Sequence, residues 1–290
     1  MLRRLALLTA LLVPTAGLAQ IAGKVLVVPA ALGVADCTSS TTYVTIAWTS
    51  TITPVTGDVY NLYVSSVSSG ACPTTGTPPG TQLGGDIPAL GISGTYPVTG
   101  TLTRHDFISA AGIADTACVA GGTSTTINVC VQQLAGSVVR ATMSGSVPLE
   151  LENPPAPVNV SVASGDSALY VSWSNGTDNG VAPTSYRVTA EAVGNPGDTH
   201  TESYTGTSNQ RISGLTNGVT YSVWVVAVSA GGNQSTASVA VTGTPQHVAD
   251  FWEQYKGAGG QEQGGCGGGP AGLVSLLGVA LALRGLRRRS

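Results

Sequence analysis

The sequence predicts an all-β protein of two tandem β-sandwiches, with a short hydrophobic segment at each end of the chain. Three observations support this fold class. Gly, Ser, Thr and Val are abundant, while charged residues make up 9% of the chain and Phe occurs only twice. Short runs of alternating apolar residues are separated by Gly, Asn, Asp and Pro, which is typical of strands and turns. The two halves also share an outline, in which a Trp ends one strand and a Tyr begins the next.

Residues 1–19 are predicted to be a secretory signal peptide. Basic residues precede an apolar stretch, and the small residues Gly17 and Ala19 stand just before the expected cleavage point at Gln20. The apolar stretch is too short for a comfortable membrane span. A lipoprotein signal would have Cys at the position of Gln20, so we expect any lipid anchor elsewhere.

The charge of the chain argues against a nucleic-acid partner. Between Gln20 and Cys266 there are six basic residues against fifteen acidic residues, a net charge of −9. Binding to phosphates needs clustered Lys and Arg. We therefore expect no nucleic acid among the partners of this region.

Residues 20–151 are predicted to form the first sandwich. In TTYVTIAWTSTITPVTGDVYNLYVSSV, Trp48 and Tyr60 stand where the second half also has a Trp and a Tyr, and TTINVCVQQLAGSVVRATMSGSV parallels the last hairpin of that half. A Gly- and Pro-rich insertion is expected from Gly70 to Gly100.

Four of the five cysteines lie in this region: Cys37, Cys72, Cys118 and Cys130. An even count in an exported domain favours disulfides. Three pairings are allowed, and we favour Cys37 with Cys72 and Cys118 with Cys130 because short loops close readily; each bond would contribute about 2 to 4 kcal/mol. Zinc is the alternative, but Cys-x-x-Cys and a neighbouring His pair are missing from the sequence, so we expect no metal and no other cofactor.

Residues 152–245 show the clearest strand pattern. The runs VNVSV, ALYVSW, YRVTAEA, YSVWVVAV and ASVAVTG predict five strands, and a weaker sixth is expected around 199–204. Strands of this length, separated by turns, favour a sandwich.

The same region has Trp173, Tyr186, Leu215 and Tyr221 at four spaced positions. With these residues it resembles a fibronectin type III domain. The resemblance implies a tyrosine corner, in which the buried Tyr221 bonds through its hydroxyl to backbone a few residues upstream. It also implies a binding or spacer module rather than a catalyst. The first half lacks the Leu and Tyr corner pattern, so we expect it to be either fibronectin-like or an immunoglobulin-like variant.

The sequence contains none of the motifs HExxH, GxSxG, GxxxxGKS or an EF-hand. Arg104, His105 and Asp106 form one charged cluster with Ser109 nearby, but three adjacent residues cannot all converge on one atom. The NGTDNG loop around Asp178 has the composition of a turn as well as of a weak cation site, and we favour the turn.

Trp224 is the main candidate for a binding surface. If Tyr221 and Val223 face the core, alternation turns Trp224 outward. An outward Trp can anchor a glycan or a protein partner. Arg187 on the neighbouring strand is expected to cover the ring through a cation–π contact, which would make the role of this pair structural.

Residues 246–265 are predicted to be a Gly-rich linker with a short amphipathic helix. Val248, Phe251, Trp252 and Tyr255 recur at helical spacing. We expect a frayed linker helix that rests on the sandwich or on a membrane, with a specific docking motif as the alternative.

Residues 266–290 combine a lone cysteine, an apolar run and an arginine cluster. The sixteen residues from Ala271 to Leu286 span only about 24 Å as a helix, against a hydrocarbon core of about 30 Å. This short hydrophobic helix is a marginal span. Clustered arginines stay on the cytoplasmic side, so we expect Cys266 and everything before it outside the inner membrane.

These features resemble the MYXO-CTERM sorting tails of exported myxobacterial proteins. The matching positions are Gly265, Cys266 and Gly267, the apolar run 273–283, and the arginines Arg287, Arg288 and Arg289. The resemblance implies cleavage by a sorting protease in the membrane and display at the cell surface, with Cys266 as a candidate position for lipid. A spare thiol in a linker and an uncut inner-membrane anchor are the alternatives.

The sequence therefore predicts a non-catalytic protein of the cell surface or outer membrane of a Gram-negative bacterium, serving adhesion, recognition or envelope structure. Its ligand is expected to be an unidentified protein or glycan. The alternative is a secreted or periplasmic enzyme or enzyme inhibitor with an unrecognised site in the first half. A pocket with converging polar groups in the Gly70–Gly100 insertion would favour that alternative, and a flat disordered loop would favour the first prediction.

Overall fold

The computed structural model describes residues 23–67 and 71–260 of the 290-residue chain. The predicted signal peptide and the predicted sorting tail both lie outside these residues. No helix among the residues described is long and apolar enough to cross a membrane.

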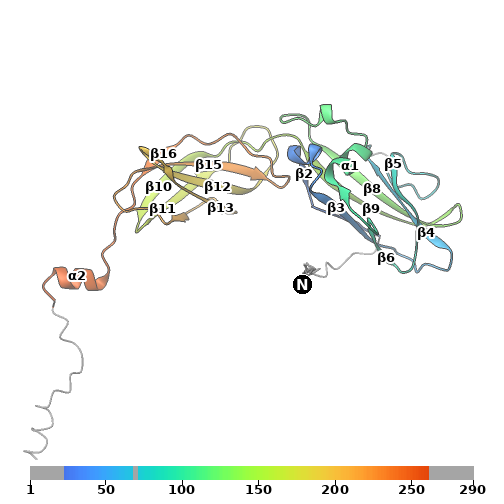
Figure 1. Cartoon of the computed structure of the whole chain (residues 1–290), viewed down its shortest axis with the longest axis horizontal. Helices are drawn as coiled ribbons and strands as arrows, with labels where there is room; N and C mark the ends of the chain where they lie inside the picture. The colour runs from blue at the N-terminus through green and yellow to red at the C-terminus, as the bar shows by residue number, and fades with distance from the viewer. Residues whose placement is uncertain (1–22, 68–70, 261–290) are drawn as a thin grey trace, which may run out of the picture. The chain divides into compact units, whose positions relative to one another are not determined.

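The first sandwich is built from nine strands and three short helices (Figure 1). The strands are β1 (Val25–Val28), β2 (Leu32–Gly33), β3 (Tyr43–Thr49), β4 (Asp58–Ser65), β5 (Thr81–Pro88), β6 (Ser93–Tyr96), β7 (Leu102–Thr103), β8 (Thr125–Ala135) and β9 (Val138–Glu150). The helices are η1 (Val34–Thr38), α1 (Arg104–Ala110) and η2 (Asp115–Ala117). One sheet has the order β1-β3-β6, with β7 also paired to β3, and the other has the order β2-β9-β8-β4-β5.

The core of the first sandwich follows from strand alternation. Val44, Ile46 and Trp48 of β3 are buried and belong to one cluster with Tyr60 and Leu62 of β4. The rings of Trp48 and Tyr60 meet edge to face with 5.3 Å between their centroids. Because successive side chains of a strand point to opposite faces, the alternating residues seen in the sequence supply this core.

The expected insertion from Gly70 to Gly100 contains two strands of the sheets, β5 and β6. β5 forms the edge of the larger sheet, and β6 pairs with β3. Neither strand was predicted from the sequence, because both are exposed along much of their length and rich in small residues. Residues before β5 lie over β8, where Gln132 Nε2 donates to the carbonyl oxygens of Pro73 (3.1 Å) and Gly76 (3.0 Å).

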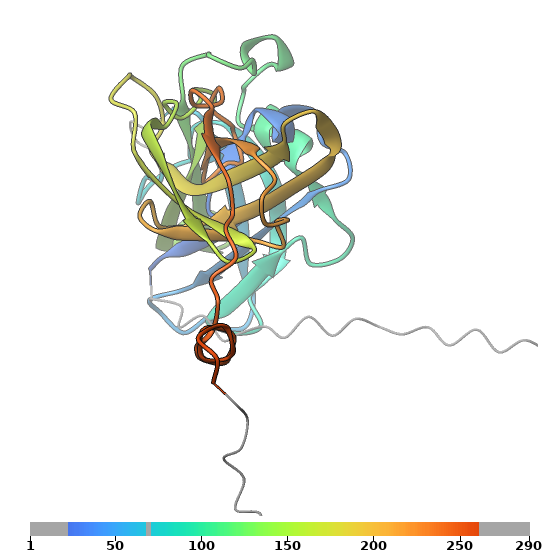
Figure 2. The same ribbon diagram turned by 90° about the vertical axis from the view of Figure 1, so that its left-hand side faces the viewer.

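The second sandwich has seven strands. Its strands are coloured from yellow-green to orange in Figure 2. They are β10 (Val158–Gly165), β11 (Ala168–Ser174), β12 (Pro183–Ala192), β13 (Asn195–Tyr204), β14 (Gln210–Ser213), β15 (Tyr221–Ser229) and β16 (Val241–Gly243). The two sheets have the orders β10-β11-β14 and β13-β12-β15-β16. β13 confirms the weak sixth strand, whereas β14 was not predicted because four residues are too few to show alternation.

The last strand of this sandwich is shorter than the run ASVAVTG predicted. Before β16 the chain follows β15 through serine side chains: Ser235 Oγ accepts from Ala227 N–H at 2.9 Å, and Ser238 Oγ accepts from Val225 N–H at 3.0 Å. These hydroxyls take the place that strand carbonyls occupy in a regular ladder. Buried backbone donors need such partners, so the two serines complete the edge of β15.

The two sandwiches meet around one buried asparagine. Asn233 Oδ1 accepts from Val34 N–H at 3.0 Å, and its Nδ2 donates to the carbonyl oxygens of Glu150 (2.6 Å) and Glu152 (3.1 Å). The carboxylate of Glu150 also accepts from Gly231 N–H at 2.7 Å. The side-chain amide of Asn233, in the connection between β15 and β16, thus bonds to two parts of the first sandwich. One is Val34 near its start, and the other is the end of β9 with the residues that follow it.

Candidate functional site

All four cysteines of the first sandwich form disulfides, as expected, but the predicted pairing is wrong. The bonds join Cys37 to Cys118 and Cys72 to Cys130. They close 81 and 58 residues of sequence, rather than the short loops that we favoured. Sheet packing decides the pairing, because Cys130 lies within β8 and the segment before β5 passes over that strand.

In the charged cluster at residues 104–106, His105 Nδ1 lies 3.5 Å from Asp106 Oδ1, while Arg104 has a separate partner. Arg104 Nη1 contacts the buried Asp36 carboxylate at 2.7 Å, whereas His105 Nε2 lies 3.2 Å from Asp115. Asp106 N–H donates to Thr103 Oγ1 at the start of α1. Among the residues described, no group of three or more His, Cys, Asp or Glu side chains is placed to hold a metal ion.

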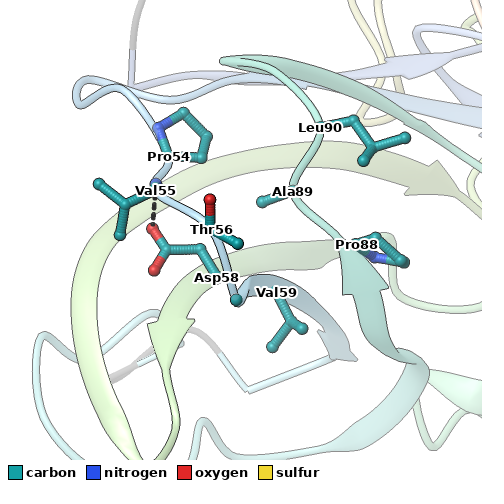
Figure 3. A pocket seen from close by; sticks show the side chains of 9 residues that line it. Pro54, Val55, Thr56, Asp58, Val59, Pro88, Ala89 and Leu90 are labelled. Atoms are coloured by element: carbon teal, nitrogen blue, oxygen red, sulfur yellow. Dashed lines mark hydrogen bonds between the residues drawn. The ribbon is translucent and has the colours of Figure 1, made fainter.

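A cavity of about 460 Å³ lies at one end of the first sandwich, between residues 54–59 and residues 88–90 (Figure 3). Its lining residues are Pro54, Val55, Thr56, Gly57, Asp58, Val59, Pro88, Ala89 and Leu90. Asp58 is the only ionisable residue among them. Figure 3 shows its carboxylate turned toward the backbone of Val55 and away from the Pro88–Leu90 segment.

The carboxylate of Asp58 is held by a buried hydrogen-bond network. Its Oδ2 accepts from Val55 N–H (3.1 Å), Gln133 Nε2 (2.7 Å) and Arg140 Nη1 (2.5 Å). Gln133 Oε1 in turn accepts from Ser50 Oγ at 2.6 Å. This network ties the loop between β3 and β4 to β8 and β9, so the rim of the cavity rests on a fixed base.

The pKa of Asp58 is set by opposing effects. Burial removes water from the carboxylate and raises its pKa, but the hydrogen bonds from Gln133 and Val55 and the charge of Arg140 outweigh that effect and lower it. The group is therefore ionised at neutral pH. It is placed to support the loop rather than to donate a proton into the cavity.

The exposed apolar residues Val55 and Leu90 line this cavity, and the exposed Ile92 follows Leu90 by two residues. We name these three residues the loop patch. Leu90 is 96% exposed, and Val55 and Ile92 are also exposed. Loops that carry apolar side chains on a fixed scaffold are common binding sites. This patch was not predicted from the sequence, although Pro54 beside Val55 and Pro88 two residues before Leu90 were a signal that these residues lie on stiff loops.

Trp224 does face outward, as predicted, because its neighbours Val223 and Val225 are fully buried. The ring is half-buried and lies beside Thr189 of β12. Arg187 lies opposite Val226, and its guanidinium donates to Gln234 Oε1 at 2.8 Å. The charge that was expected over the Trp224 ring is thus engaged by an amide instead.

The tyrosine corner of the second sandwich is present. Tyr221 is fully buried, and its hydroxyl accepts from Thr216 N–H at 3.0 Å and donates to Asp198 Oδ2 at 2.9 Å. Leu215 and Trp173 are buried in the same cluster. Trp173 meets the ring of Tyr186 edge to face with 5.2 Å between centroids.

The residues predicted to direct sorting lie outside the residues described. These are Gly265, Cys266 and Gly267, with Arg287, Arg288 and Arg289. Processing, lipid attachment and topology therefore stay predictions.

Fold and site define a tandem β-sandwich protein. Residues 153–244 match the model of the fibronectin type III domain, so the second sandwich is a domain of that family. No protein of curated function matches the chain in sequence.

Several solved structures are similar to the chain. The FN1–FN3 domains of chicken CNTN1 are 13% identical, with 79% of this chain and 68% of that chain covered and a TM-score of 0.45. A two-domain fibronectin type III segment of chicken tenascin is 16% identical, with 71% and 95% covered and a TM-score of 0.29. The fn3 domain of the human collagen alpha-1(XX) chain is 26% identical, with 34% and 90% covered and a TM-score of 0.29.

Proposed function

We propose that this is an exported, non-catalytic surface protein that recognises another protein through the loop patch of its first sandwich. The observation that carries the proposal is Leu90, which is almost completely exposed beside a cavity that Pro, Val and Ala residues line together with Thr56, Gly57 and Asp58. Two disulfides support export, because such bonds persist outside the reducing cytosol.

The chemistry of the loop patch favours a protein partner over a glycan. Leu, Val, Ile and Pro side chains complement apolar side chains, whereas sugar rings commonly stack on aromatic rings. The patch is also supported from below by the Asp58 network, so little ordering is needed when a partner binds. A glycan would instead suit Trp224, the other candidate surface.

The cavity supports binding rather than catalysis. Its one carboxylate is engaged by Val55, Gln133 and Arg140. The other lining residues are Pro, Val, Ala, Leu, Gly and Thr. An enzyme site would need several polar groups that converge on one reacting atom.

The recognition proposal is tested by measuring how a fluorescent, mature full chain binds to producer cells and to beads coated with the same chain. A buried hot-spot side chain contributes about 2 kcal/mol or more to binding, so Leu90→Asp should weaken binding by at least about tenfold. Val98→Asp is the matched control, because Val98 is 64% exposed and follows the opposite end of β6. Equal binding by both variants would contradict the proposal, and loss on Trp224→Ala alone would move the site to β15.

The location is proposed from the tail: cleavage near Cys266 would release the apolar run and leave the sandwiches at the cell surface. Mass spectrometry of the mature chain tests this step. We expect a C-terminus at or near Cys266, whereas an intact Arg289 would indicate a permanent inner-membrane anchor.

A further inference from the structure

Figure 1 labels the short helix α2 (Phe251–Gly257). Three of its side chains are aromatic and exposed, and we name them the aromatic cluster: Phe251, Trp252 and Tyr255. Phe251 is 70% exposed and Trp252 is 57% exposed. The rings contact one another, with centroids 5.4 Å apart for Phe251 and Trp252 and 6.0 Å apart for Phe251 and Tyr255. Exposed aromatic residues gathered in this way indicate a surface that meets an apolar environment.

The helix is short but well defined at its start. Asp250 Oδ1 accepts from Glu253 N–H at 2.8 Å, and Glu253 Oε2 accepts from Asp250 N–H at 3.1 Å. This capping box satisfies two backbone donors that would otherwise lack partners. Helices of this length are marginal in water, so the cluster gains from a surface that stabilises it.

The helix is strongly amphipathic. At 3.6 residues per turn, the three aromatic residues fall within an arc of about 100°. The polar residues Glu253, Gln254 and Lys256 occupy the remaining arc. One side of the helix is therefore apolar and aromatic, and the other side is suited to water, which is the pattern of a helix that lies in a membrane interface.

Trp and Tyr prefer the interface between lipid headgroups and hydrocarbon, because each has an apolar ring and a polar atom. Acidic residues outnumber basic ones in this helix and its cap, since Asp250 and Glu253 stand against Lys256. Attraction to anionic lipid is therefore not the basis of binding. The chemistry fits a zwitterionic phospholipid surface.

The chain after the helix keeps the cluster close to such a surface. Thirteen residues, rich in Gly, separate Gly257 from Ala271, where the apolar run begins. From composition alone, a Gly-rich segment of this length would have a root-mean-square span of about 20 Å. Once the tail is in a membrane, the cluster faces that membrane at an effective concentration of order mM, so a weak affinity is enough for contact.

We propose that the aromatic cluster is a second membrane contact, which lies among the headgroups of the bilayer that the tail enters. This inference rests on the proposed sorting tail, whose apolar run lies in the membrane until cleavage near Cys266 releases it. The apolar run is too short for a comfortable span, and stable attachment commonly takes two signals rather than one. The cluster supplies the second signal.

The test uses the full chain reconstituted in phosphatidylcholine vesicles, with and without lipids brominated near the headgroup. Flotation first reports whether the chain is in the membrane, and quenching of tryptophan emission then reports whether Trp252 reaches the interface. We expect flotation together with quenching and a blue shift. Trp252→Phe should lose both signals, while Trp224→Phe should keep them.

Phe251→Ser and Gln254→Ser separate the aromatic cluster from the rest of the helix. Phe251→Ser should reduce the quenching of Trp252 several-fold without changing flotation, and Gln254→Ser, on the polar side, should leave it unchanged. Flotation without quenching of Trp252 would overturn the inference and leave insertion of the tail intact. Failure to float would overturn both.

Discussion

Trp48 and Tyr60 in the first sandwich meet in almost the same geometry as Trp173 and Tyr186 in the second, with ring centroids 5.3 Å and 5.2 Å apart. Around these pairs the two sandwiches differ. The first is closed by two disulfides and a buried Asp58 network. The second contains no cysteine, and its crossover depends on the hydroxyl of Tyr221.

The difference follows from the length of the connections. Closing a long loop costs more conformational entropy than closing a short one, and the disulfides of the first sandwich close 81 and 58 residues of sequence. The second sandwich has short turns between most of its strands, so single hydrogen bonds suffice. The same aromatic core can therefore be stabilised covalently or by hydrogen bonds.

Removal of one disulfide should produce the largest change in the stability of one sandwich relative to the other. The double variant Cys72→Ser with Cys130→Ser should lower the free energy of unfolding of the first sandwich by about 4 kcal/mol, because it releases a long loop in the unfolded chain. The second sandwich should keep its stability. Urea unfolding read by hydrogen exchange in peptides from each sandwich measures both, and an equal loss in the two would refute the assignment.

Removal of the hydrogen bonds between serine hydroxyls and β15 should lower the stability of the second sandwich by an intermediate amount. Ser235→Ala or Ser238→Ala leaves a buried N–H of Ala227 or Val225 without its side-chain acceptor, which costs about 1 to 3 kcal/mol. Ser146→Ala is the control in the first sandwich, where β9 is a continuous strand and Ser146 is exposed. That control should change stability by less than about 0.5 kcal/mol, as measured by urea denaturation.

Acid should destabilise both sandwiches, through different carboxylates. Burial raises the pKa of Glu202, but hydrogen bonds from Ser213 and Tyr204 outweigh it, so the pKa is lowered as it is for Asp58. A carboxyl whose pKa is lower in the folded state than in the unfolded state stabilises the protein at pH values above its unfolded pKa, which is about 4. That stability is lost as the pH falls through the folded-state pKa.

Replacing each carboxylate by a neutral amide tests whether it causes the acid sensitivity of its own sandwich. Asp58→Asn should make the stability of the first sandwich less dependent on pH as the pH falls below about 4, the unfolded pKa of a carboxyl. Glu202→Gln should do the same for the second sandwich. Unfolding followed separately in the two sandwiches at several pH values measures this. A variant that flattens the wrong sandwich would show that other carboxylates dominate.

The sequence by itself determined the features that depend on local spacing. Alternation predicted β3, β4, β8 and most strands of the second sandwich, because a two-residue period fixes which side chains are buried. The spacing of Leu215 and Tyr221 predicted the corner, and helical spacing predicted α2. The paired Trp and Tyr positions also indicated that each half has a core built around the same pair of aromatic residues.

Only the tertiary structure decided the features that depend on which segments meet. Cys72 pairs with Cys130 because the segment before β5 lies over β8. The number of residues between two cysteines does not show which segments lie together. β5 was concealed because an exposed edge strand needs no apolar alternation. Leu90 became a candidate binding residue once packing left it exposed beside a cavity, since exposure is a property of the assembled sheets and not of neighbouring residues.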